Sequence, residues 1–135
     1  MDLKTAVQVS ASGLRAQSLR MRVIAENLAN QDSVAQIAGG DPYRRKVAAF
    51  RAEVDRKTGA TEVRVQNIAT DKSAFGRVYQ PGNPAADDKG YVLRPNVNGL
   101  VEAADMKAAQ RSYEANLNAI EAAKSLTMRT IDLLK

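Results

Sequence analysis

The hydrophobic positions of this chain fall into two long heptad patterns, one at each end. Near the N-terminus, steps of four and three residues connect Leu3, Val7, Ser10, Leu14, Gln17, Met21, Ile24 and Leu28. Near the C-terminus, the same steps connect Ala103, Met106, Gln110, Tyr113, Leu117, Ile120, Lys124, Thr127, Ile131 and Leu134. A repeat of about 3.5 residues is typical of a seam between paired helices. The sequence therefore predicts two amphipathic helices that pack lengthwise, within one chain or between subunits.

The flanking residues set the expected ends of the two helices. The first helix is predicted from about Leu3 to about Ala29, and the second follows Asn98 or Gly99, either of which can cap it. Gly13 lies among small residues of the first helix. It is either a tolerated glycine, costing ~1 kcal/mol relative to Ala, or a point where another helix approaches closely.

Three polar residues, Gln110, Lys124 and Thr127, interrupt the C-terminal pattern. Buried polar residues in a seam can fix the register and the choice of partner. Alternatively, these three side chains lie at the rim of the seam, with Lys124 extended toward solvent.

Residues 31–98 have a different character, because they contain all four prolines and most of the glycines. Short antiparallel strands are expected among residues 47–54, 62–66, 75–79 and 91–93, with a hairpin turn at residues 55–59 and a loop at residues 80–90. Five of the six aromatic residues also fall here, so this region can hold a small core. The predicted fold is mainly α, with residues 1–30 and 99–135 as a helical domain and residues 31–98 as a β-rich insertion.

The residue types argue against catalysis. Histidine and cysteine are absent, and no spacing of acids, serines or glycines matches a catalytic, metal or phosphate site. The segment around Asp87 and Asp88 lacks the alternating oxygen ligands of a calcium loop, so a solvated turn is predicted there. No catalytic residue, metal or cofactor is therefore predicted.

The net charge of +5 is spread thinly, and its only dense point is Arg44-Arg45-Lys46. These three residues form a candidate basic patch that would meet an acidic surface on another subunit. Charge reversal there is expected to weaken assembly without affecting the fold. The alternatives are a site that binds a phosphate or the acid group of a glycan, a strand edge that its charges keep soluble, and a small architectural nucleic-acid-binding protein.

No targeting segment or membrane span is predicted. The longest uncharged run near the N-terminus, residues 5–14, is too polar for a signal-peptide core and too short to cross a bilayer.

Several segments, in order along the chain, resemble the bacterial flagellar basal-body rod proteins. Residues 11–17 and 21–30 resemble the N-terminal signature shared by the rod, hook and related axial proteins. Residues 42–46, 78–84, 87–92, 95–98 and 111–116 resemble the rod group more specifically, and within it the proximal rod proteins. The resemblance covers essentially the whole chain. Ala103 and Ala104 depart from it, because bulkier apolar residues are common there.

The resemblance implies a fold and a cellular role. Axial proteins of this kind pair their terminal helices as an antiparallel coiled coil that lines an inner tube, with a small β-rich part facing outward. They polymerise with copies of themselves and with other rod subunits, and they meet the membrane-anchored ring and the export apparatus indirectly. They are exported to the periplasm by the flagellar type III system without a cleaved signal peptide.

The helix pattern and the resemblance together indicate which residues form the assembly seam. The expected seam residues are Val7, Leu14, Met21, Ile24, Leu28, Met106, Tyr113, Leu117, Ile120, Ile131 and Leu134.

Overall fold

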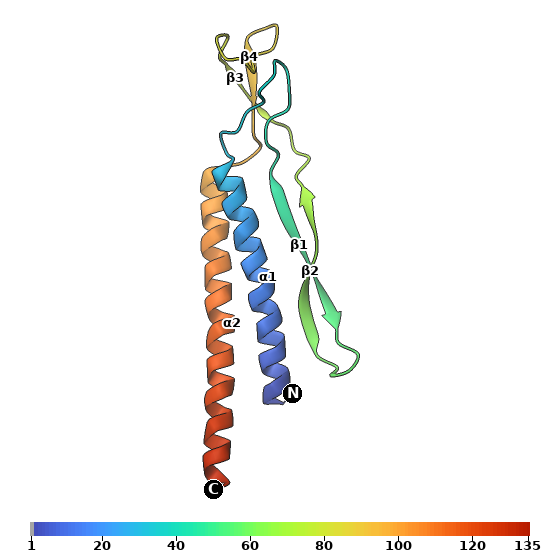
Figure 1. Cartoon of the computed structure of the whole chain (residues 1–135), viewed down its shortest axis with the longest axis vertical. Helices are drawn as coiled ribbons and strands as arrows, with labels where there is room; N and C mark the ends of the chain where they lie inside the picture. Colours follow the sequence, from blue (N-terminus) through green and yellow to red (C-terminus); the bar gives the residue numbers. More distant parts are fainter. Residues whose placement is uncertain (1) are drawn as a thin grey trace. The chain divides into compact units, whose positions relative to one another are not determined.

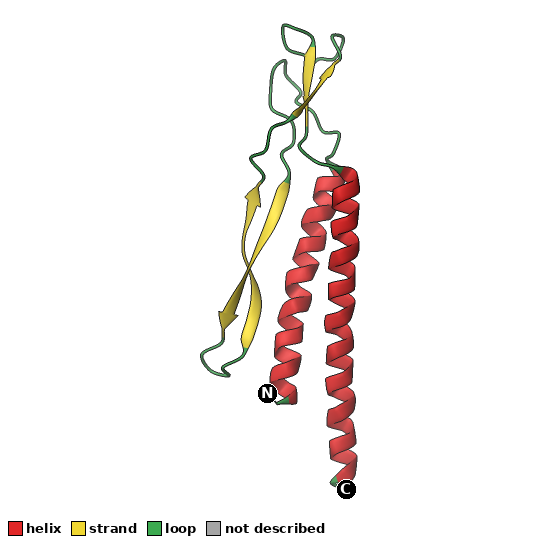
Figure 2. Ribbon diagram, turned by 180° about the vertical axis from the view of Figure 1, so that it is seen from behind, coloured by secondary structure: helices red, strands yellow, loops and turns green. Residues whose placement is uncertain are grey.

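The computed structural model describes residues 2–135 and contains two long helices and four strands (Figure 1). The helices are α1 (Leu3–Ala29) and α2 (Gly99–Leu133); the strands are β1 (Lys46–Val54), β2 (Thr61–Thr70), β3 (Gly76–Tyr79) and β4 (Tyr91–Arg94). Both predicted helices are confirmed, with their boundaries. The expected short strands between them are also present (Figure 2).

Short polar side chains cap the N-terminal end of each helix. The Asp2 carboxylate accepts a hydrogen bond of 2.6 Å from the Thr5 amide at the start of α1. The Asn98 side-chain oxygen accepts bonds from the Leu100 and Val101 amides, at 3.1 and 3.4 Å. These bonds satisfy amide groups that have no partner within a helix, and the second confirms Asn98 as the predicted cap.

Each pair of strands forms its own two-stranded sheet. The β1–β2 hairpin turns at residues 55–59, as predicted, where the Asp55 amide bonds to the Ala60 carbonyl at 2.8 Å. In the antiparallel β3–β4 pair, Tyr79 lies opposite Tyr91. Gly90 closes that loop with a φ of 84°, and a Cβ there would come within 2.8 Å of the Tyr79 ring, so glycine is required.

The chain forms two compact units, and both helices contribute to each. The first unit comprises Met1–Met21, Ala48–Asn67 and Lys107–Lys135; the second comprises Arg22–Val47 and Ile68–Met106. Within the first unit, α1 lies between α2 and the β1–β2 hairpin (Figures 1 and 2). The proposed division into a helical domain and an insertion follows sequence segments, and it stays a prediction.

Small side chains dominate the interior. The buried apolar residues are Ala16, Ala60, Ala109 and Ala123 in the first unit, and Val23, Ile24, Ala85 and Val92 in the second. None of the aromatic side chains is fully buried among residues 2–135. The core of the middle region therefore uses Val92 and Ala85, while Tyr79 and Tyr91 meet edge to face at 5.3 Å near its surface. Across this same range, neither helix is long and apolar enough to cross a membrane.

Candidate functional site

The two helices meet through small and polar side chains. In the second unit, Asn27 Nδ2 of α1 donates to Glu102 Oε2 of α2 at 3.3 Å. In the first unit, a Cβ on Gly13 would lie 2.7 Å from the Asn116 side chain. The close approach proposed for Gly13 is therefore confirmed, since any larger residue would require Asn116 to move.

The seam on α2 is rotated from the predicted line. The positions recurring every seventh residue are Glu102, Ala109, Asn116 and Ala123, each one residue before a predicted seam position, and all are buried or half-buried. The predicted seam positions that alternate with these, Met106, Tyr113 and Ile120, have half-buried side chains, as expected. Smaller side chains allow closer packing of the helices, and Leu117 is left 39% exposed.

The predicted seam residues thus separate into three groups. Ile24 is buried; Val7, Leu14, Met21, Leu28, Met106, Tyr113 and Ile120 are half-buried; Leu117, Ile131 and Leu134 are exposed. Gln110, Lys124 and Thr127 are also exposed, which agrees with the rim interpretation of all three residues.

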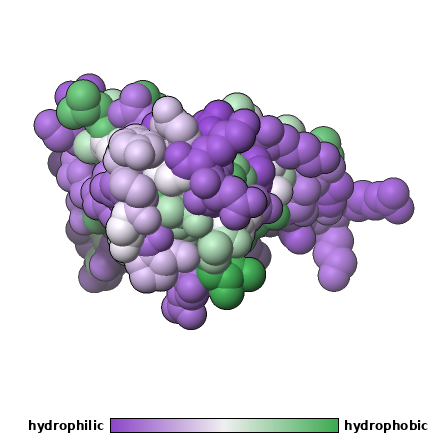
Figure 3. All heavy atoms as spheres, turned by 90° about the horizontal axis from the view of Figure 1, so that it is seen from above, coloured by the Kyte–Doolittle hydropathy of each residue, from purple (hydrophilic) through white to green (hydrophobic). Residues whose placement is uncertain are grey.

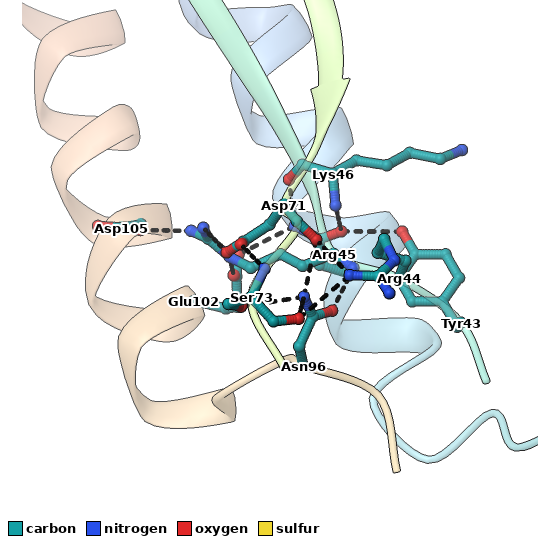
Figure 4. A network of polar contacts seen from close by, with 10 residues as sticks. Tyr43, Arg44, Arg45, Lys46, Asp71, Ser73, Asn96, Glu102 and Asp105 are labelled. Atoms are coloured by element: carbon teal, nitrogen blue, oxygen red, sulfur yellow. Dashed lines mark hydrogen bonds and ion pairs between the residues drawn. The ribbon is translucent and has the colours of Figure 1, made fainter. Parts of the chain in front are cut away.

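A partly buried polar cluster joins the helices to the start of β1 (Figure 4). We call Asn27, Arg45, Asp71, Asn96 and Glu102 the polar junction. Asn27 is 1% exposed, and its amide makes four hydrogen bonds. It donates to Glu102 and to the Lys46 carbonyl, and it accepts from the Tyr43 hydroxyl at 2.8 Å and the Lys46 amide at 2.9 Å. This is the full capacity of a side-chain amide.

Arg45 supplies the positive charge of the polar junction. Its Nε donates to Glu102 Oε1, and Glu102 is 0% exposed. Its terminal nitrogens lie 3.4 Å from Asp71 and 3.6 Å from Asp105. Figure 4 shows Arg45 pointing toward Glu102 and Asp105 on α2, whereas Lys46 points away. A buried carboxylate requires such a partner, because desolvation of an unpaired charge is costly.

Asn96 ties the loop before α2 to the other segments. Its side-chain oxygen accepts from the Arg45 amide at 2.7 Å, and its Nδ2 donates to the Asp71 carbonyl at 2.9 Å. Arg44 donates to the same carbonyl at 3.0 Å, and its guanidinium lies 4.1 Å from the Phe75 ring centre. The junction therefore connects α1, β1, the loop after β2 and α2.

The charged groups respond to this arrangement. The Ser73 amide, which donates to Asp71 at 2.8 Å, and then Arg45 lower the pKa of the Asp71 carboxyl. The hydrogen bond to Glu102 raises the pKa of Arg45. Burial, together with nearby Glu26, raises the pKa of Tyr43. At neutral pH Arg45 is thus a guanidinium, Asp71 is a carboxylate, and the adjacent Tyr43 is a neutral phenol.

In the first unit, polar side chains also attach the hairpin to α1. Gln8 Nε2 donates to Asp55 at 2.9 Å and to Glu62 at 2.6 Å, and the Val63 amide donates to the Ser12 hydroxyl at 3.1 Å. The alternation at residues 62–66 predicted a half-buried strand. Glu62 is the buried member and Val63 is partly exposed, because Gln8 and Ser12 meet this strand with polar groups.

Apolar surface remains uncovered where α1 begins. A groove of about 510 Å³ is lined by Leu3, Lys4, Val7, Thr127, Thr130 and Ile131. Farther along α2, Leu134 is 82% exposed. We call Leu3, Val7, Thr127, Ile131 and Leu134 the apolar ledge. The face of the molecule seen in Figure 3, by contrast, is mostly hydrophilic with small hydrophobic patches.

Comparison with known proteins gives consistent matches. The family model described as flagellar basal body rod FlgEFG protein C-terminal matches residues 88–133. The flagellar basal-body rod protein FlgC of Agrobacterium fabrum is 47% identical over 98% of this chain and 96% of its own length. FlgC proteins of Yersinia enterocolitica (98% of each chain) and Aquifex aeolicus (100% of this chain, 99% of its own) are 42% and 40% identical. The chain belongs to the flagellar basal-body rod protein FlgC family.

Membership of the FlgC family leaves the nucleic-acid-binding alternative without support. Each basic residue of the patch also has a partner within the chain. Arg44 donates to the Asp71 carbonyl, Arg45 pairs with Glu102, and Lys46 pairs with Glu26 at 2.6 Å. Reversing the charge of Arg45 would place a second carboxylate beside buried Glu102, so the expectation that charge reversal spares the fold does not hold. Contact of this patch with another subunit stays a prediction.

The sequence patterns missed most of the polar junction. Asn27 and Glu102 each lie one residue before a seam position predicted from apolar side chains. Asn27 and Asn96 do fall in segments that resemble the rod proteins, and this resemblance was the only sequence feature that could have pointed to them. Asp71 had none, because its role depends on Arg45, which is 26 residues away.

Proposed function

We propose that this chain is a structural subunit of the bacterial flagellar basal-body rod that polymerises through its terminal helices. The observation that carries this proposal is the identity of 47% with a rod protein over nearly the entire chain. The rod would serve as part of the drive shaft and of the export tube.

The spacing of the helix contacts supports an antiparallel coiled coil. Gly13 and Asn27 on α1 are two heptads apart, and so are their partners Asn116 and Glu102 on α2. Partners that advance by whole heptads in opposite directions are expected of a left-handed antiparallel seam.

The uncovered side chains of α2 support contacts with other subunits. Leu117 and Ile131 are 39% and 46% exposed, and both continue the heptad spacing of the seam. Exposed apolar side chains on a helix are stabilised by burial against a second helix. We assign Leu117 and the apolar ledge to contacts between subunits.

The partners would be copies of this chain and other rod subunits, with the membrane-anchored ring and the export apparatus contacted indirectly. The subunit would reach the periplasmic part of the basal body by type III export without a cleaved signal peptide. It would act by packing and not by chemistry, consistent with a sequence lacking histidine and cysteine.

Complementation of a strain that lacks this gene tests the proposal. The native chain should restore rods, filaments and swimming to cells that still make the basal ring. Leu117→Asp should abolish swimming, because a carboxylate in an apolar contact is costly to desolvate. Asn118→Asp, on the adjacent exposed position, is the matched control and should swim normally.

Two results would count against the proposal. If the deletion strain still builds complete rods, the chain is not a rod subunit. If Leu117→Asp swims as well as Asn118→Asp while both proteins are produced, Leu117 is not at a subunit contact.

A further inference from the structure

The small residues of the seam between the two helices distinguish poorly between registers. The seam's closest positions on α2 include Ala109 and Ala123, which are interchangeable by a shift of two heptads. A shift of α2 by one heptad would place Ala123 opposite Gly13 in place of Asn116, and it would bring Asn116 to the place of buried Ala109. Since alanine is smaller than asparagine, packing at Gly13 would not oppose that shift.

The polar junction, in contrast, is complete in only one register. The same shift moves α2 by about 10 Å and places Ala109 opposite Asn27. Glu102 would then lose both Arg45 and Asn27, which occupy its two carboxylate oxygens. Asn27 would lose one of its four hydrogen bonds, and Arg45 would lose its closest acid. Unpaired buried polar and charged groups are costly.

We propose that the polar junction is a register lock, in which Asn27, Arg45 and Glu102 fix the axial position of α2 against α1. A buried ion pair is weak evidence for stability, and its best-attested role is to specify register. The lock goes beyond the proposed function. It determines which residues of α2 extend past the start of α1, and this does not depend on which partner binds those residues.

The absence of cysteine allows register to be measured by engineered disulfides. Gly13→Cys with Asn116→Cys reports the observed register, since a Cβ at residue 13 would lie 2.7 Å from the Asn116 side chain. Gly13→Cys with Ala123→Cys reports the shifted register. Residues 116 and 123 are about 10 Å apart along α2, so a cysteine at residue 13 cannot form a disulfide with both positions in the same register. After brief oxidation of the purified full chain, non-reducing gels separate intrachain from interchain products.

The decisive variant replaces the lock with apolar residues: Asn27→Leu, Arg45→Met and Glu102→Leu. Such replacements of a buried ion pair often preserve stability. With the native lock, the 13–116 disulfide should exceed the 13–123 disulfide by at least about tenfold. In the apolar variant that ratio should fall at least about tenfold, with the helical circular dichroism retained.

A matched control removes the neighbouring exposed ion pair through Glu26→Gln and Lys46→Met. Exposed pairs contribute little, so the disulfide ratio should not change. An unchanged ratio in a helical apolar variant would overturn the register lock. Loss of helix in that variant would overturn it too, since the junction would then supply stability and not register. Neither result bears on whether the chain is a rod subunit.

Discussion

Arg45 contacts three acids, Asp71, Glu102 and Asp105, so its removal leaves more charge unpaired than any other single change in the polar junction. Arg45→Met should lower the free energy of unfolding by about 3 kcal/mol, because Glu102 remains buried without its cation. Urea denaturation measures this loss. Lys46→Met removes only an exposed pair and should cost much less. Equal losses in the two variants would contradict a special role for Arg45.

Gly13 and Asn116 should behave as a coupled pair. Gly13→Ala should leave the stability of the native chain nearly unchanged, because the gain in helix propensity is offset by displacement of the overlapping Asn116 side chain. In an Asn116→Ala background the same change should instead stabilise by about 0.5–1 kcal/mol, through helix propensity. A double-mutant cycle from thermal unfolding gives the coupling. Additive effects would mean that the helices separate easily at this point.

Asp71 should contribute to sensitivity to acid. Hydrogen bonds from Ser73, and then Arg45, hold its folded-state pKa below the unfolded value. A group shifted in this direction stabilises the fold above its unfolded pKa of about 3.9, and that contribution is lost as the pH falls through the lower, folded-state pKa. Asp71→Asn should therefore reduce the difference in urea midpoint between pH 7 and pH 3. The same difference in Asp71→Asn and in the native chain would contradict this role of Asp71.

At the scale of the elements, the local patterns were sufficient to locate the helices, the hairpin turn and the loop at residues 80–90. The heptad positions that face the other helix could not be predicted, because alanine, glycine and buried polar residues occupy them. Larger apolar residues lie beside these positions. Leu117 and Asn116 illustrate the difference. Which side chains of β2 are buried could not be predicted either, since buried Glu62 is hydrogen-bonded to Gln8, a residue 54 positions away.

The two ends of the helix pair should differ in protection. In hydrogen exchange on the isolated monomer, we expect slow exchange near the polar junction, over residues 22–29 and 99–110. Exchange should be fast over residues 126–135, where apolar side chains are exposed. Strong protection across residues 126–135 in a verified monomer would contradict this expectation.

At the scale of the whole molecule, the apolar ledge should matter for assembly and little for folding. Removing residues 127–135 should leave the helical circular dichroism of the remaining residues unchanged, because this segment supplies few buried side chains. Self-association measured by sedimentation velocity should be lost, together with complementation of the deletion strain. Arg129→Gln, which keeps the segment and removes one exposed charge, is the control and should assemble normally.

The sequence separations within the polar junction have a kinetic consequence. Its bonds join residues 75, 57 and 51 positions apart, so each closes a long loop whose entropy must be lost before the contact forms. The junction should therefore form after the folding transition state, once the helices and the hairpin are in place. Weakening it should accelerate unfolding and leave the folding rate nearly unchanged. The native lifetime of a single subunit would then depend on a cluster that contributes little to how fast the chain first folds.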